Sequence, residues 1–81
     1  MEAKQKIEVI LLGKKIKALI VEKNLTVMNV AHDANLDATN LRKYIRGSQE
    51  MKVTTLIRIA AALNVSTSEL LDDLLKYKNE N

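Results

Sequence analysis

Residues 26–47, TVMNVAHDANLDATNLRKYIRG, contain two short stretches with apolar residues at helical spacing, 27–34 and 38–46. Only a few residues around Asn35 separate them. Asparagine tolerates the left-handed backbone that ends a helix, and Asp37 is a residue type that caps the start of the next one. Because the connection is so short, the pattern predicts two helices that cross sharply instead of forming an antiparallel hairpin.

The apolar residues of both stretches define their buried faces. The inward residues expected in 27–34 are Val27, Val30, Ala31 and Ala34. In 38–46 the inward stripe is Leu41, Tyr44 and Ile45, and Gly47 ends the helix. The rest of 38–46 is small, polar or basic, so this second helix presents a polar face to its surroundings.

That polar face has the chemistry of a DNA-reading surface. An α-helix fits the major groove, where asparagine pairs with adenine, arginine or lysine reaches guanine, and the methyl groups of threonine and alanine meet thymine. The residues expected to contact bases are Ala38, Thr39, Asn40, Arg42 and Lys43.

Further helices are expected on both sides of this pair. One spans roughly residues 5–23, stops at Asn24, and leaves Thr26 to cap the next helix. After a loop over 48–52, another helix begins at Val53 or Thr54 and ends at Asn64. The start of the last helix is indicated by Ser66, which precedes Glu69 by three residues in a capping-box arrangement. That helix is expected from Thr67 to Tyr77, with 78–81 frayed.

Composition sets the class of protein. The 81 residues suffice for one domain, 1–81, and with no proline, two glycines and 47% hydrophobic residues we expect an all-α fold of five helices without strands. There is no cysteine, which excludes disulfides and thiolate metal sites. No apolar run approaches the length of a membrane span, so we expect a cytoplasmic protein without a membrane partner, metal or cofactor.

Charge is distributed unevenly along the chain. The net charge is only +3, but five basic residues lie between Arg42 and Arg58 against one acid, Glu50. The tail from Glu69 onward carries four acids and two lysines. A local positive excess of this kind favours contact with phosphate, and it places that contact away from the C-terminal end.

From Leu12 to Leu70 the chain resembles the phage-repressor and Cro-like helix-turn-helix family, also called the xenobiotic-response-element class. The matching positions are Leu12, Ile16, Leu19, Leu25, Val30, Ala31, Leu36, Leu41, Gly47, Leu56, Ile59, Ala60, Leu63, Val65 and Leu70. The resemblance implies a repressor-like fold with a family core of about 12–70 and a helical N-terminal extension, 1–11. It also implies a recognition helix that starts at the cap Asp37.

The resemblance extends to DNA-backbone contacts. The groups expected to contact phosphate are the side chains of Thr26, Arg46, Gln49 and Lys52 and the backbone amides of Val27 and its neighbours. Val27 stands where the family often has glutamine, and Ile45 where it has glutamate. Asn35 replaces the usual turn glycine and Met51 the proline common after the loop.

No set of residues has the spacing of a catalytic site. His32 has no second histidine or cysteine at ligand spacing and is expected on the surface. Thr26 and Ser66 have no base at a motif spacing, so capping explains them better than nucleophilic catalysis. The two tyrosines offer no platform for stacking single-stranded bases. The chain is therefore not expected to be an enzyme.

Apolar residues near the ends exceed what a small domain hides. Leu70, Leu71, Leu74 and Leu75 are the expected interface of a twofold homodimer, with help from Ile7, Val9 and Ile10. The alternative is that the first helix runs longer and folds back over the last. The function expected is a transcription regulator that binds a pseudo-palindromic operator and occupies a promoter or contacts RNA polymerase. The rival is a protein-interaction module that has lost specific DNA binding.

Overall fold

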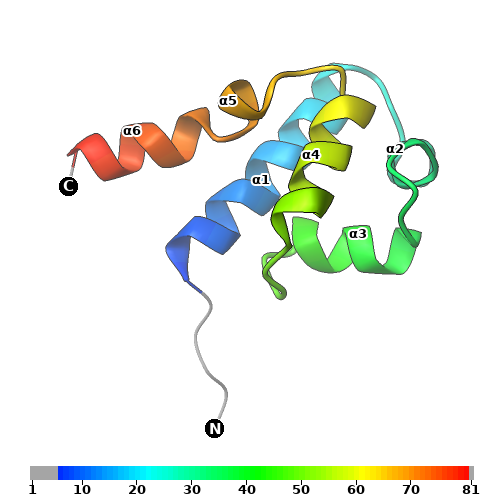
Figure 1. The fold of residues 1–81 in the computed structure, drawn as a ribbon, viewed down its shortest axis with the longest axis horizontal. Helices are drawn as coiled ribbons and strands as arrows, with labels where there is room; N and C mark the ends of the chain where they lie inside the picture. The colour runs from blue at the N-terminus through cyan, green and yellow to red at the C-terminus, as the bar shows by residue number, and fades with distance from the viewer. Residues whose placement is uncertain (1–5, 81) are drawn as a thin grey trace, which may run out of the picture.

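A computed structural model describes residues 6–80, with side chains up to Tyr77. Figure 1 shows its helices arranged around α1 and α4. Their bounds are α1 Ile7–Glu22, α2 Val27–Asp33, α3 Ala38–Ile45, α4 Val53–Ala62, α5 Thr67–Leu70 and α6 Asp72–Glu80. No strand occurs among the described residues, and the expected all-α class is confirmed. The expected number of five helices is wrong, since the structure has six in this part of the chain.

One core joins α1 to α5. Its completely buried side chains include Ile16 of α1, Leu41 of α3 and Ile59 of α4, each with 0% of its surface exposed. The faces expected to point inward do so: Val30, Ala31 and Ala34 are buried in and after α2, and Tyr44 is 8% exposed. Val27 and Ile45 are half-buried and pack against the same core.

Three helices end in the same way, each at an asparagine with a left-handed backbone. The φ angles of Asn24, Asn35 and Asn64 are 59°, 59° and 58°. In each case the next amide reaches back five residues, as where Leu36 N–H donates to the Ala31 carbonyl oxygen at 2.8 Å. This pattern satisfies carbonyl groups left open at the end of a helix. Gly47 ends α3 with φ 72°.

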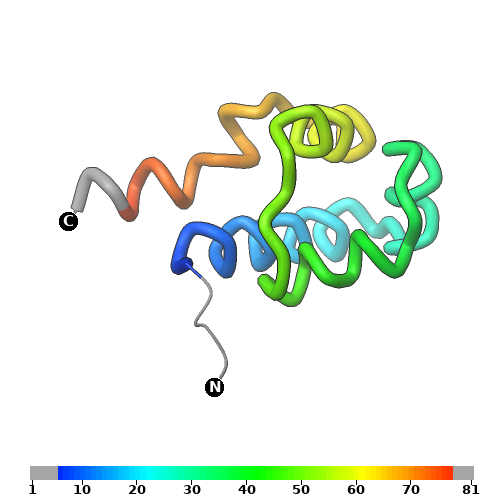
Figure 2. The backbone as a smooth tube through the Cα atoms, turned by 60° about the horizontal axis from the view of Figure 1, so that its bottom comes forward, coloured from blue at the N-terminus to red at the C-terminus, as the bar shows by residue number. Residues whose placement is uncertain are grey.

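The C-terminal region differs from the expectation of one helix over 67–77. The chain breaks at Leu71, between α5 and α6. Leu70 is 1% exposed because it is inserted into the core, whereas α6 extends away from it (Figure 2). Asp72 and Asp73 lie in the first turn of α6, where acidic side chains favour a helix start. α6 also continues to Glu80, past its expected end at Tyr77.

The expected N-terminal extension is part of α1. This helix begins at Ile7 and packs against α5 and α6, which is the alternative of a longer first helix folded back over the C-terminal region. Val9 is 8% exposed and belongs to the buried apolar residues, so its expected place in an interface is wrong. The predicted residues 1–5 of the extension and residue 81 of the tail lie outside the described range.

Candidate nucleic-acid interface

The connection between α2 and α3 places the two helices as expected from residues 26–47. The Thr26 hydroxyl oxygen accepts a hydrogen bond from the Asn29 amide at 3.1 Å and so caps α2. Asp37 caps α3, where its carboxylate accepts from the Thr39 amide at 3.4 Å. Between them Leu36 is half-buried against the core. Both caps and the left-handed Asn35 fix where each helix starts and ends, and hence the angle at which they meet.

The outer face of α3 is polar and basic. Thr39, Asn40 and Arg42 are exposed, and Lys43 is half-buried. Ala38 is half-buried and packs against the core, which leaves only part of its methyl group accessible. None of the ion pairs among the described residues involves a basic side chain of α3 or of its C-cap residue Arg46. In the described part of the chain these positive charges are thus not paired with an acidic side chain.

α3 is braced from behind by Gly13 of α1, a residue that sequence reasoning passed over. A Cβ atom at this position would lie 2.5 Å from the carbonyl oxygen of Ile45 and closer still to that of Tyr44. The backbones of the two helices therefore meet here, and only glycine fits. A glycine inside a strongly helical segment was the available signal, because glycine there usually costs stability unless packing requires it.

The expected phosphate contacts lie at the ends of the helices. Arg46 follows α3, Gln49 is in the loop, Lys52 immediately precedes α4, and all three are exposed. Thr26 is exposed, but its hydroxyl oxygen already accepts the Asn29 amide. Val27 is half-buried, so its backbone is the only part of it suited to an anion. Backbone amides at the start of α2 were expected to bind phosphate, but the amide of Asn29 already donates to the Thr26 hydroxyl oxygen.

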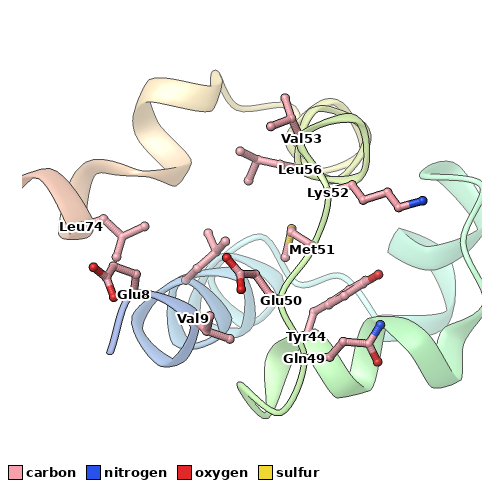
Figure 3. A pocket seen from close by; sticks show the side chains of 11 residues that line it. Glu8, Val9, Tyr44, Gln49, Glu50, Met51, Lys52, Val53, Leu56 and Leu74 are labelled. Atoms are coloured by element: carbon pink, nitrogen blue, oxygen red, sulfur yellow. The ribbon is translucent and has the colours of Figure 1, made fainter. Parts of the chain in front are cut away.

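The loop before α4 covers a hollow of about 140 Å³ (Figure 3). Most of its walls are apolar: Val9, Leu12, Tyr44, Met51, Val53, Leu56 and Leu74. Figure 3 shows Met51 directed into the space while the Lys52 side chain extends away from it. Met51, expected in a polar loop, is half-buried and packs against the core. The hollow thus connects the loop beside α3 with Leu74 of α6.

The four leucines expected in a dimer interface are not equivalent. Leu70 is buried inside the single chain, so it offers almost no surface to a second copy and its assignment to the interface is corrected. Leu71 and Leu74 are half-buried, and Leu75 is 55% exposed. Two exposed residues of α4 that were not expected, Val53 and Ile57, are 70% and 52% exposed.

Other kinds of site find no support in the described part of the chain. Residues 6–80 contain no group of three or more histidine and acidic side chains placed to hold a metal ion. The side chain of His32 is 90% exposed and lies 3.5 Å from the carboxylate of its neighbour Asp33. None of the described helices has the length and apolarity required to traverse a membrane.

Comparison with known proteins is consistent with this geometry. Residues 15–78 match the family model of the Cro/C1-type HTH DNA-binding domain. The chain belongs to this family. A curated relative, the SPbeta prophage-derived uncharacterized HTH-type transcriptional regulator YopO of Bacillus subtilis (strain 168), is 37% identical over 62 residues. That match covers 76% of this chain and 89% of YopO.

Solved structures of regulators with the same fold include restriction-modification controller proteins. C.AhdI from Aeromonas hydrophila superposes with a TM-score of 0.77 at 22% identity, over 80% of this chain and 98% of its own. Wild-type C.Esp1396I has a TM-score of 0.82 at 25% identity, over 95% and 100%. The C.Esp1396I tetramer in complex with its natural 35 base-pair operator has a TM-score of 0.81 at 26% identity, over 89% and 95%.

Family membership confirms three expectations from the sequence. The resemblance to the repressor-like helix-turn-helix class is correct, and so is the repressor-like fold. The Cro/C1-type HTH protein is a DNA-binding transcription regulator and not an enzyme.

Proposed function

We propose that this Cro/C1-type HTH protein is a sequence-specific regulator that binds a pseudo-palindromic operator in double-stranded DNA as a homodimer. The observation that carries the proposal is the basic outer face of α3, where Thr39, Asn40 and Arg42 are exposed and no basic side chain forms an ion pair with another described residue. In this proposal Thr39, Asn40, Arg42 and Lys43 contact base edges in the major groove. Ala38 adds the accessible part of its methyl group.

Contacts to the DNA backbone orient α3 in the groove. Arg46, Gln49 and Lys52 lie at the end of α3, in the loop and before α4, and they supply phosphate contacts in this proposal together with Thr26 and the amide of Val27. Such contacts fix register but carry no sequence information. Since each neutralised phosphate releases counterions, affinity falls steeply as salt concentration rises.

The homodimer is proposed from the apolar surface shared by α4 and α6. Val53, Ile57 and Leu75 are each more than half exposed, and Val53 lines the same hollow as Leu74. A twofold dimer buries this surface and presents two copies of α3, which a pseudo-palindrome requires at a spacing of roughly 34 Å, one turn of DNA. The operator-bound relative C.Esp1396I is itself a tetramer.

Binding at an operator regulates transcription in one of two ways. The bound dimer occupies the promoter and excludes RNA polymerase, or it contacts the polymerase and recruits it. Both outcomes use the same DNA-reading face, so the first experiment addresses DNA.

Selection of duplexes from a random-sequence library, followed by measurement of affinity for the enriched sites, tests the proposal. We expect enriched sites to be pseudo-palindromic and to be bound at least about 10³-fold more tightly than random duplex at physiological salt. Failure to enrich any sequence, with the protein folded by circular dichroism, would contradict the proposal. That result would favour the rival function, a protein-interaction module on the same scaffold.

A further inference from the structure

Tyr44 of α3 carries a hydroxyl group that forms no hydrogen bond to any described residue. The side chain is only 8% exposed, and its ring is part of the core cluster that also contains Leu41. The side-chain hydrogen bonds of the described residues do not include the Tyr44 hydroxyl. Yet none of these residues has a buried polar side-chain atom without a partner. The hydroxyl oxygen of Tyr44 therefore reaches the surface, while the ring stays in the core.

The hydroxyl emerges at the edge of α3 that faces the loop before α4. Tyr44 follows the exposed Asn40 by four residues, so both lie on the same side of the helix, one turn apart. Gln49 and Lys52 of the loop line the same hollow as Tyr44. In Figure 3 the hydroxyl end of the Tyr44 ring is directed away from Leu74, to the side toward which the Lys52 side chain extends. This edge thus lies between the residues proposed for bases and those proposed for phosphate.

The chemistry of the hydroxyl suits a phosphate oxygen. A tyrosine hydroxyl can donate a hydrogen bond, and tyrosine is among the side chains that contact the backbone in protein–DNA complexes. The one acid of the loop, Glu50, does not take this donor: its carboxylate lies 3.7 Å from the Lys6 ammonium nitrogen. Because the Tyr44 ring is already held in the core, a hydrogen bond to DNA would require little further ordering of the side chain.

We propose that the Tyr44 hydroxyl donates a hydrogen bond to a phosphate oxygen of the DNA strand that passes along the loop before α4. The buried ring then fixes the distance between that strand and α3, and Gln49 and Lys52 contact the same strand. Tyr44 belongs in this way both to the core and to the DNA-binding surface. This inference rests on the proposed function and goes beyond it, because it gives a core residue a contact with DNA.

The first test is Tyr44→Phe, which removes the hydroxyl and keeps the ring, with Tyr77→Phe of α6 as the matched control. Affinity is measured by fluorescence anisotropy on the selected operator and on a random duplex, at several salt concentrations. Thermal melting followed by circular dichroism should give the wild-type melting temperature for Tyr44→Phe, since the hydroxyl has no partner among the described residues. A clearly lower melting temperature would overturn the inference, because it would assign the hydroxyl a role in folding.

For Tyr44→Phe we expect binding to both duplexes to weaken by at least about tenfold, as is typical when a hydrogen bond to a charged group is lost. The loss should be equal on both, because phosphate contacts carry no sequence information. The slope of log affinity against log salt should stay that of the wild type, since a neutral hydroxyl neutralises no phosphate charge. Tyr77→Phe should bind as the wild type does. Equal affinities of Tyr44→Phe and wild type would overturn the inference.

A second test locates the contact on the DNA. Operators are prepared that each carry one methylphosphonate, in which a methyl group replaces a non-bridging phosphate oxygen. At the phosphate bound by Tyr44 this replacement should weaken binding of the wild type about tenfold more than binding of Tyr44→Phe, which has already lost the contact. Additive losses at every phosphate would overturn the inference. Absence of specific DNA binding by the wild type would instead overturn the proposed function, and the inference with it.

Discussion

α3 and α6 both pack against α1, but they are attached to it differently. α3 meets α1 through a backbone contact at Gly13, and its Leu41 is completely buried. α6 is held by the half-buried Leu74, by Leu71 just before the helix, and by the Lys15–Asp73 pair at 4.0 Å. In the proposed function the α3 face is therefore already fixed when DNA binds, which reduces the entropic cost of binding. α6 instead retains exposed apolar surface that a second copy can bury.

The largest difference in stability between α3 and α6 is expected when one leucine of each helix is truncated to alanine. Leu41→Ala leaves a cavity in the core and should lower the free energy of unfolding by about 2–5 kcal/mol. Leu75→Ala truncates a side chain that is 55% exposed, so it should change the free energy of unfolding of the monomer by less than about 0.5 kcal/mol. Urea unfolding at dilute protein measures both. Equal losses would contradict the difference in attachment.

A second substitution tests the backbone contact. In most helices Gly→Ala stabilises by about 0.5–1 kcal/mol, because glycine is a poor helix former. At Gly13 the new methyl group would clash with backbone carbonyl oxygens of α3, so we expect Gly13→Ala to destabilise by about 1–3 kcal/mol. Thermal melting of the variant and the wild type shows whether the substitution lowers or raises stability. Stabilisation would show that α3 is not clamped at this point.

The proposed dimer surface is tested at its most accessible leucine. Leu75→Glu should shift the protein from dimer to monomer in sedimentation velocity, because a charge in an apolar interface loses its hydration without a partner. The half-buried Leu71 and Leu74 are poorer choices, since charge there also disturbs the contact with α1. Leu75→Ala serves as the control for size. Dimers of unchanged stability in Leu75→Glu would exclude this surface as the interface.

A small effect is also expected where α6 meets α1 through charge. Asp73→Asn removes the partner of Lys15, and because the Asp73 side chain is half exposed the loss should stay below about 1 kcal/mol. The same melting experiment at low and high salt checks this. A loss of several kcal/mol would mean that the ion pair, and not the leucines, holds α6.

Much of the fold follows from the sequence because local signals agree with the packing. Asn24, Asn35, Asn64 and Gly47 each end a helix where the chain was expected to turn. The polar face of α3 follows from the apolar spacing of Leu41 and its neighbours, and in the structure Thr39, Asn40 and Arg42 lie exposed on it.

The C-terminal region was not predictable to the same degree. Apolar spacing continues through Leu70, Leu71 and Leu74, so periodicity alone does not reveal the break between α5 and α6. It also does not distinguish a leucine buried within one chain, such as Leu70, from one left for a partner. Both depend on where α1 lies, and that is set by contacts between distant parts of the chain.

The central claim is that the exposed side chains of α3 read base sequence. The measurement is the ratio of affinities for the selected operator and a random duplex, compared between wild type and R42A/K43A at one salt concentration. Each base contact contributes about 1–3 kcal/mol of discrimination, so the double variant should lose at least about tenfold of this ratio while its helical circular dichroism is unchanged. A ratio equal to that of the wild type would show that α3 does not read the DNA.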